Sequence, residues 1–162
     1  MKKINITIVI AGKEDYPGCA DILATCPEFR VVACPTGLYE AAAWTAISQS
    51  DVVLLDEAVL ERDGVETVRR ICDSYPLLKL LLLMERESEA RTLEALSLGV
   101  SGVMERASMV SMLRKAIPVL YSGETWVSRE LVHSLRNYLN ELEENSYLAA
   151  VGGMRPGQGK LN

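Results

Sequence analysis

The sequence contains a single histidine among its 162 residues. His133 lies far along the chain from any cluster of acidic residues, so neither a catalytic triad nor a histidine-ligated metal site is favoured. Four cysteines are present, but none has the C-x-x-C spacing of a redox dithiol or a zinc site. We therefore expect Cys19, Cys26, Cys34 and Cys72 to be simple reduced thiols, with Cys34 and Cys72 buried.

Other familiar sequence features are also missing. No apolar run approaches the ~20 residues that cross a bilayer, and the basic start Met1–Ile4 is followed by no cleavage site, so we expect a cytoplasmic protein without membrane contact. The net charge of −5 disfavours nucleic-acid binding by this segment itself. Ala11-Gly12-Lys13 lacks the spacing of a phosphate-cradling loop.

The stretch Asp51–Asp56 has the sequence Asp-Val-Val-Leu-Leu-Asp. Four consecutive apolar residues predict a strand buried on both faces, which would place Asp56 at the carboxyl edge of a parallel sheet. Open α/β folds carry their chemistry at that edge. Asp63-Gly64 predicts a turn before the next helix. Asp56 could serve there as a nucleophile, a metal ligand or a helix cap.

Strand and helix patterns alternate along the first 121 residues. The predicted strands are 4–10, 29–34, 52–55, a segment within 77–84, and 102–104; the predicted helices are 17–25, 38–48, 64–74, 87–98 and 108–121. This alternation requires crossover connections and hence a parallel sheet covered on both faces. We predict a doubly wound α/β domain with five strands in the order 2-1-3-4-5.

The remainder of the chain has a different character. Trp126 is expected to anchor an additional helix, capped by Ser128, within a C-terminal extension at 122–148. Residues 149–162 have the composition of a flexible linker. Pro118 is expected to bend or shorten the preceding helix, which Ser108 would cap.

The order of these parts resembles the receiver domain of two-component response regulators of the NarL/FixJ (LuxR) type. The resemblance covers Ile4 to about Leu135 and rests on Asp51–Asp56 with Asp63-Gly64, on Glu94–Gly102 and on Ser122–Ser128. It implies a flavodoxin-like fold, no enzymatic role, and a linker leading to a helix-turn-helix domain outside this chain. DNA would then be bound only by that separate domain.

In this family Asp56 would accept a phosphoryl group from a histidine kinase, with Mg²⁺ bridging the two anions. The chain departs from the family pattern around it. The acidic pair falls at Gly12-Lys13, the switch hydroxyl at Met84 and the lysine at Arg106. Asp56 and the backbone carbonyl of Ala58 fit directly.

Further departures concern signal transmission and the metal. The family's Met-Pro is Val59-Leu60 here, and its switch aromatic is Val103. Lys13 could pair with Asp56 and occupy the place of the metal. Alternatively, Glu14 and Asp15, just downstream, could supply Mg²⁺ ligands together with Asp56 if the loop is reshaped.

We therefore predict an atypical receiver that regulates a transcription factor without normal Mg²⁺-dependent phosphorylation and needs no cofactor. A conventional phosphoacceptor receiver using Mg²⁺ is the alternative, and a small flavodoxin-like enzyme or nucleotide binder is a third possibility. The expected output surface is 87–121, where exposed charges could form ion pairs across an interface; they are Arg91, Glu94, Arg114 and Lys115. A homodimer is expected through this surface or through the 128–145 helix.

Overall fold

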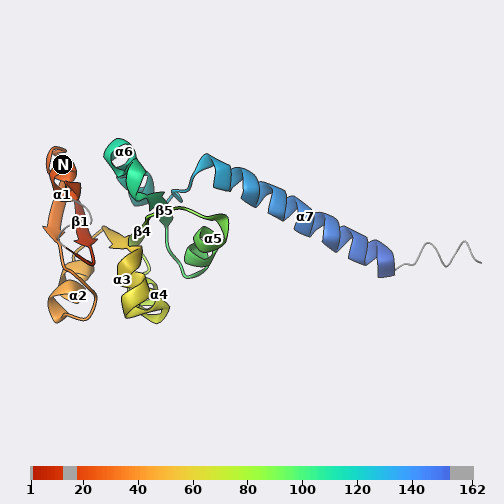
Figure 1. Ribbon diagram of the computed structural model, residues 1–162, viewed down its shortest axis with the longest axis horizontal. Helices are drawn as coiled ribbons and strands as arrows, with labels where there is room; N and C mark the ends of the chain where they lie inside the picture. Colours follow the sequence, from red (N-terminus) through yellow and green to blue (C-terminus); the bar gives the residue numbers. More distant parts are fainter. Residues whose placement is uncertain (1, 13–17, 154–162) are drawn as a thin grey trace, which may run out of the picture. The chain divides into compact units, whose positions relative to one another are not determined.

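The computed structural model describes residues 2–12 and 18–153. The chain divides into two compact units, Met1–Val127 and Ser128–Asn162. Figure 1 shows the strands and all but one of the helices in the first unit and a single long helix in the second. Lys13, Glu14, Asp15 and the predicted helix start at Pro17 lie outside the described residues.

The first unit is built on one parallel sheet. Its strands are β1 (Ile4–Val9), β2 (Phe29–Ala33), β3 (Val52–Asp56), β4 (Lys79–Met84) and β5 (Gly102–Glu105). They are arranged in the order β2-β1-β3-β4-β5, and every pairing is parallel. The predicted doubly wound topology is confirmed, and β3 lies at the centre of the sheet.

Helices cover both faces of this sheet. The helices are α1 (Cys19–Ala24), α2 (Ala41–Ser48), α3 (Glu57–Asp63), α4 (Val65–Ser74), α5 (Glu89–Ser97) and α6 (Met109–Tyr121), with a 3₁₀ turn η1 (Arg106–Ser108) before α6. Residues of α1 and α6 share one core with the sheet, and residues of α2 to α5 share the other.

The central strand feeds both cores. Val52 and Leu54 pack into the core beneath α1 and α6, whereas Val53 and Leu55 pack into the opposite core. All four side chains are fully buried. The run of apolar residues is therefore explained by a strand whose alternate side chains point into two different cores.

Helix α3 was not predicted from the sequence. We expected a turn between β3 and the next helix, but residues 57–63 form a helix whose N-cap is Asp56. Asp63-Gly64 is the junction between α3 and α4, and Gly64 adopts a φ of 89°. A seven-residue helix is too short for its apolar period to be read from the sequence.

Expectations about Pro118, Ser108 and two of the cysteines need correction. Helix α6 contains Pro118 and continues to Tyr121, so the proline does not shorten it. Ser108 holds the N-cap position without a side-chain capping hydrogen bond, because η1 leads directly into the helix. All four cysteines are free, but neither Cys34 nor Cys72 is buried as expected. Cys34 is exposed since it lies beyond the end of β2, and Cys72 is half-buried. Burial raises the pKa of the Cys19 thiol to about 12.

The segment after α6 belongs to the first unit. Val103 donates its N–H to the Trp126 carbonyl over 2.9 Å, and the Trp126 N–H binds the Ser101 carbonyl over 3.1 Å. The Trp126 side chain packs against the core that also holds α1 and α6. Trp126 therefore adds one bridge at the β5 edge of the sheet, and residues 122–127 fall within the first compact unit.

Helix α7 (Arg129–Gly153) forms the second unit. The Ser128 hydroxyl accepts the Leu131 N–H over 3.2 Å, which confirms the predicted N-cap. The helix continues through residues 149–153, which we had assigned to the linker. Among the described residues, every helix is too short or too polar to cross a lipid bilayer.

The contact between β5 and Trp126 can be tested at Gly102. A Cβ atom there would lie 2.7 Å from the Trp126 carbonyl oxygen and 2.9 Å from its Cβ. Gly102→Ala should therefore lower the free energy of unfolding by about 1–3 kcal/mol in urea titrations. Gly152→Ala is the control, because a Cβ at Gly152 meets no atom within 4 Å and helix propensity favours alanine. Equal stability of Gly102→Ala and the native chain would contradict this packing.

Candidate functional site

Asp56 lies at the carboxyl end of the central strand, as predicted, with 2% of its surface exposed. One carboxylate oxygen, Oδ1, accepts the Ala58 N–H over 3.1 Å and caps α3. The other, Oδ2, accepts the Ala11 N–H from the end of β1 over 3.3 Å. The chain's own backbone therefore holds both oxygens of this carboxylate.

The residues described around Asp56 bring together few candidate ligands for a magnesium ion. Mg²⁺ prefers an octahedron of oxygen ligands with one or two carboxylates. Among residues 2–12 and 18–153, no group of three or more His, Cys, Asp and Glu side chains is placed to hold a metal ion. Ala58 lies in the first turn of α3, where a helical carbonyl points along the axis toward residue 62. Gly12 contributes no side-chain oxygen.

The other predicted site positions cluster at the same edge of the sheet. Met84 ends β4 and is 2% exposed, and Val103 on β5 is fully buried. Both pack into the core shared with α2 to α5. Arg106 lies directly after β5, and its Nη1 is 3.2 Å from Glu85 Oε2. Met84 and Val103 thus serve as apolar packing residues at these positions.

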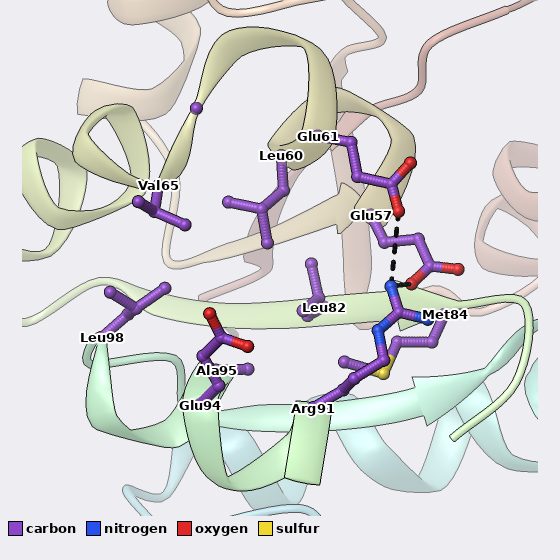
Figure 2. Close-up of a pocket in the computed structure, with 11 residues that line it drawn as sticks. Glu57, Leu60, Glu61, Val65, Leu82, Met84, Arg91, Glu94, Ala95 and Leu98 are labelled. Atoms are coloured by element: carbon purple, nitrogen blue, oxygen red, sulfur yellow. Dashed lines mark hydrogen bonds and ion pairs between the residues drawn. The ribbon is translucent and has the colours of Figure 1, made fainter. Parts of the chain in front are cut away.

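The central residue at this edge is Glu57, which sequence reasoning missed. Its side chain is largely buried, and its Oε1 accepts the Glu85 N–H over 2.7 Å. Its Oε2 forms an ion pair and hydrogen bond with Arg91 Nη2 from α5 (Figure 2). Arg91 also lies 3.4 Å from Glu61 Oε1 on α3. Glu57 therefore ties α3 both to the end of β4 and to α5.

Other charged side chains extend this arrangement toward β5. The Glu87 N–H binds Glu105 Oε1 over 2.8 Å, joining the loop after β4 to the end of β5. Glu85 links the same loop to Arg106. We call Glu57, Glu85, Arg91 and Arg106 the rim network. It connects the carboxyl ends of β3, β4 and β5 through side chains of the chain itself.

A cavity of about 320 Å³ lies beside the rim network. Leu82 and Met84 of β4 form part of its lining, together with Leu60 of α3 and Ala95 of α5. Figure 2 shows Arg91 reaching over one end of this cavity from α5 to the glutamates of α3. The Arg91 bridge therefore joins two helices that are not packed tightly against each other there.

The four charges predicted for the output surface differ in their surroundings. Arg91 is held by Glu57 and Glu61 of the same chain. Arg114 Nη2 donates to the Thr25 hydroxyl over 2.6 Å, which links α6 to α1. Glu94 and Lys115 are exposed on α5 and α6. Arg91 and Arg114 thus already make contacts inside the first unit.

Asp63 has a structural role beyond the turn expected for it. Its Oδ2 accepts the Leu38 N–H over 3.0 Å, and its Oδ1 lies 2.9 Å from Arg62 Nε. The hydrogen bond from Arg62 holds the pKa of the Asp63 carboxyl below its ordinary value of 3.8; partial burial opposes this effect, and the Leu38 N–H supports it. Asp63 therefore fixes the segment before α2 to the end of α3.

Comparison with curated proteins finds transcriptional regulators. The chain is 30% identical over 148 residues to the transcriptional regulatory protein DegU of Brevibacillus brevis, a match that covers 89% of this chain and 63% of that protein. It is 28% identical to the transcriptional regulatory protein LnrK of Bacillus subtilis, covering 90% and 66%. It is 26% identical to the DNA-binding transcriptional activator DevR/DosR of Mycobacterium tuberculosis, covering 73% and 54%. The chain spans between 54% and 66% of these relatives, and no protein-family model matches it.

Solved structures show the same fold. The isolated REC domain of RcsB from Salmonella enterica serovar Typhimurium, in the apo form, matches with a TM-score of 0.71 at 18% identity over 83% of this chain and 99% of that chain. A two-component response regulator of the LuxR family from Aurantimonas matches with a TM-score of 0.72 at 21% identity over 85% and 98%. At these identities the likeness concerns the fold.

The bond between Glu57 and Arg91 can be measured with a double-mutant cycle. Glu57→Gln keeps an acceptor for the Glu85 N–H but removes the charge that Arg91 contacts. Combined with Arg91→Ala, it should give a coupling energy of about 1 kcal/mol in urea unfolding. The cycle of Glu61→Gln with Arg91→Ala is the control; its coupling should stay below about 0.5 kcal/mol, because the Glu61 side chain is exposed. Equal coupling energies in the two cycles would mean that Glu57 binds Arg91 no more strongly than Glu61 does, and would contradict this assignment.

The lowered pKa of Asp63 predicts an acid-sensitive contribution to stability. In the unfolded chain the Asp63 carboxyl has its ordinary pKa of 3.8, so it binds a proton more readily than the same carboxyl in the native chain. Free energy of unfolding should therefore fall as the pH drops from about 5 through the native pKa. Asp63→Asn should flatten this part of the curve in urea titrations at several pH values. If the free energy of unfolding of Asp63→Asn fell with pH as steeply as that of the native chain, the lowered pKa of Asp63 would be contradicted.

Proposed function

We propose that this chain, which has the receiver-domain fold, is a response regulator of the LuxR/NarL family and regulates a transcription factor without normal Mg²⁺-dependent phosphorylation. The observation that carries this proposal is the state of the Asp56 carboxylate. Both of its oxygens accept backbone N–H groups, and the side chain is buried. Each carboxylate oxygen keeps a lone pair, but attack on an anionic phosphoryl donor also requires a cation that bridges the carboxylate to the donor. The acidic pair that would hold this cation is replaced here by Gly12-Lys13.

The rim network supports the proposal from a second direction. In a phosphorylated receiver the added anion would gather polar groups at the ends of neighbouring strands. Here Glu57 already supplies a buried anion one residue after Asp56, and Arg91 of α5 is bound to it. We propose that this internal pair sets the position of α5. The surface presented by residues 87–121 would then be formed without a phosphoryl group.

Related proteins suggest two partners, DNA and a second copy of this chain. One relative is named as a DNA-binding transcriptional activator, and one matching structure is described as two RcsB dimers bound to two parallel DNAs. We propose that this chain acts as a homodimer, in the cytoplasm, within a longer protein that binds DNA through a separate domain. The fixed surface at 87–121 would hold that domain or a second subunit.

The alternative function is that of a conventional receiver phosphorylated on Asp56 by a histidine kinase. The observation that favours it is the place of Asp56 at the carboxyl end of the central strand, where open α/β sheets place their chemistry. Mg²⁺ ligands would then have to come from Glu14 or Asp15, which lie outside the described residues.

Phosphorylation with a small donor separates the two functions. The chain is incubated with millimolar Mg²⁺ and acetyl phosphate, and its intact mass is measured at intervals. Because Gly12-Lys13 stands where the family's acidic pair would hold the cation, the mass should remain that of the unmodified chain. The same result is expected for Asp56→Asn and for Asp51→Asn, an acid at the opposite end of β3.

A phosphoryl adduct that disappears in Asp56→Asn but persists in Asp51→Asn would establish the alternative function. A positive control comes from restoring the family residues with Lys13→Asp, Met84→Thr and Arg106→Lys in one chain. This variant is expected to gain an Asp56-dependent adduct. The gain would show that the assay detects phosphorylation and that these positions limit it.

A further inference from the structure

We propose that α7 pairs with α7 of a second copy of this chain in antiparallel orientation. Helix α7 has 25 residues and carries large apolar side chains on its surface. Val132, Leu139 and Leu142 are 42%, 57% and 44% exposed. A helix that exposes such side chains gains stability by covering them with a partner. This goes beyond the proposed function, because it assigns a segment, an orientation and a register to the self-association.

The seam of α7 follows the alternating three- and four-residue spacing of a coiled coil. In chain order its positions are Val132, Leu135, Leu139, Leu142, Ser146 and Ala149. These are consecutive a and d positions of a heptad repeat, starting from Val132 as an a position. Figure 1 shows α7 as one continuous helix, so the register is uninterrupted along this length.

The sizes of the seam residues select the antiparallel orientation. The first four are Val or Leu, whereas the last two, Ser146 and Ala149, are small. In an antiparallel pair centred between Leu139 and Leu142, Leu135 would face Ser146 of the second copy. Val132 would face Ala149 in the same way. Each of these layers then combines a large side chain with a small one, which keeps the interhelical distance uniform. A parallel pair would place small residues against small residues at one end and lose packing there.

Charge complementarity selects the same orientation. Arg136 and Glu143 occupy the e positions beside the seam. In an antiparallel pair e positions face each other, so Arg136 of each copy would lie opposite Glu143 of the other. In a parallel pair Arg136 would instead face Leu131, and Glu143 would face Tyr138. The antiparallel arrangement therefore forms two ion pairs that the parallel arrangement does not.

The orientation has a geometric consequence for the ends of the helix. With its centre between Leu139 and Leu142, the pair would hold the two Gly153 ends about 38 Å apart, from a rise of about 1.5 Å per residue. Successive half-sites on one face of B-DNA are spaced by roughly 34–36 Å. The two ends of α7 would thus lie at a separation comparable with one turn of DNA.

Disulfide trapping tests the orientation directly. In the full chain with Cys34→Ser, which removes the exposed thiol, Val132→Cys and Ala149→Cys variants are mixed and oxidised mildly. The antiparallel pair predicts a disulfide between the two different variants. Each variant alone should form none, because equivalent residues would lie about 26 Å apart. Disulfides formed by Val132→Cys alone would establish a parallel pair and overturn the proposal.

Charge reversal tests the register by sedimentation equilibrium of the full chain. Glu143→Arg should weaken self-association about tenfold, because both ion pairs become repulsive. Adding Arg136→Glu should restore the native association. Glu144→Arg, which makes the same charge change on the outer face of α7, is the control and should leave it unchanged. A native chain that stays monomeric at about 100 μM, or a double variant as weak as the single one, would overturn the proposal. Neither readout involves Asp56, so this result is independent of the phosphorylation test.

Discussion

The buried carboxylate of Glu57 is the interaction on which the functional edge of this domain depends. A carboxylate is costly to bury unless its oxygens receive hydrogen bonds or an opposite charge. Glu57 meets both requirements, through the Glu85 N–H and the Arg91 guanidinium. These partners come from the end of β4 and from α5, so the position of either element cannot change without exposing or unpairing Glu57. The Glu57 side chain thus links α5 to two strands, β3 and β4, that already pair with each other in the sheet.

Asp56 and Glu57 are adjacent acids with separate structural roles. Asp56 accepts hydrogen bonds from backbone N–H groups at the end of β1 and in the first turn of α3. Glu57 accepts hydrogen bonds from elements later in the chain. Together they connect the carboxyl ends of three neighbouring strands, β1, β3 and β4. These connections are present in the unmodified chain, and Met84 and Val103 belong to the core shared with α2 to α5.

The sheet could be predicted because its determinants are local. Alternating apolar runs and turn residues marked every strand, and the crossover rule then left the observed order. Helix α3 was missed because seven residues carry too little periodicity, although Asp56 before Glu57 is a helix-start signal. The bond between Glu57 and Arg91 joins residues 34 positions apart, and no local pattern encodes such a pairing. The exposure of Cys34 depended in the same way on where β2 ends.

The central claim is that backbone amides, and not a metal ion, hold the Asp56 carboxylate. The most direct measurement is a Mg²⁺ titration of the ¹⁵N-labelled chain followed by amide NMR, with attention to the N–H groups of Ala11 and Ala58. Both donate to Asp56, so both would report any cation that takes their place. Our account predicts that their resonances stay unchanged at millimolar Mg²⁺. A saturable shift of both resonances that is absent in Asp56→Asn would contradict it.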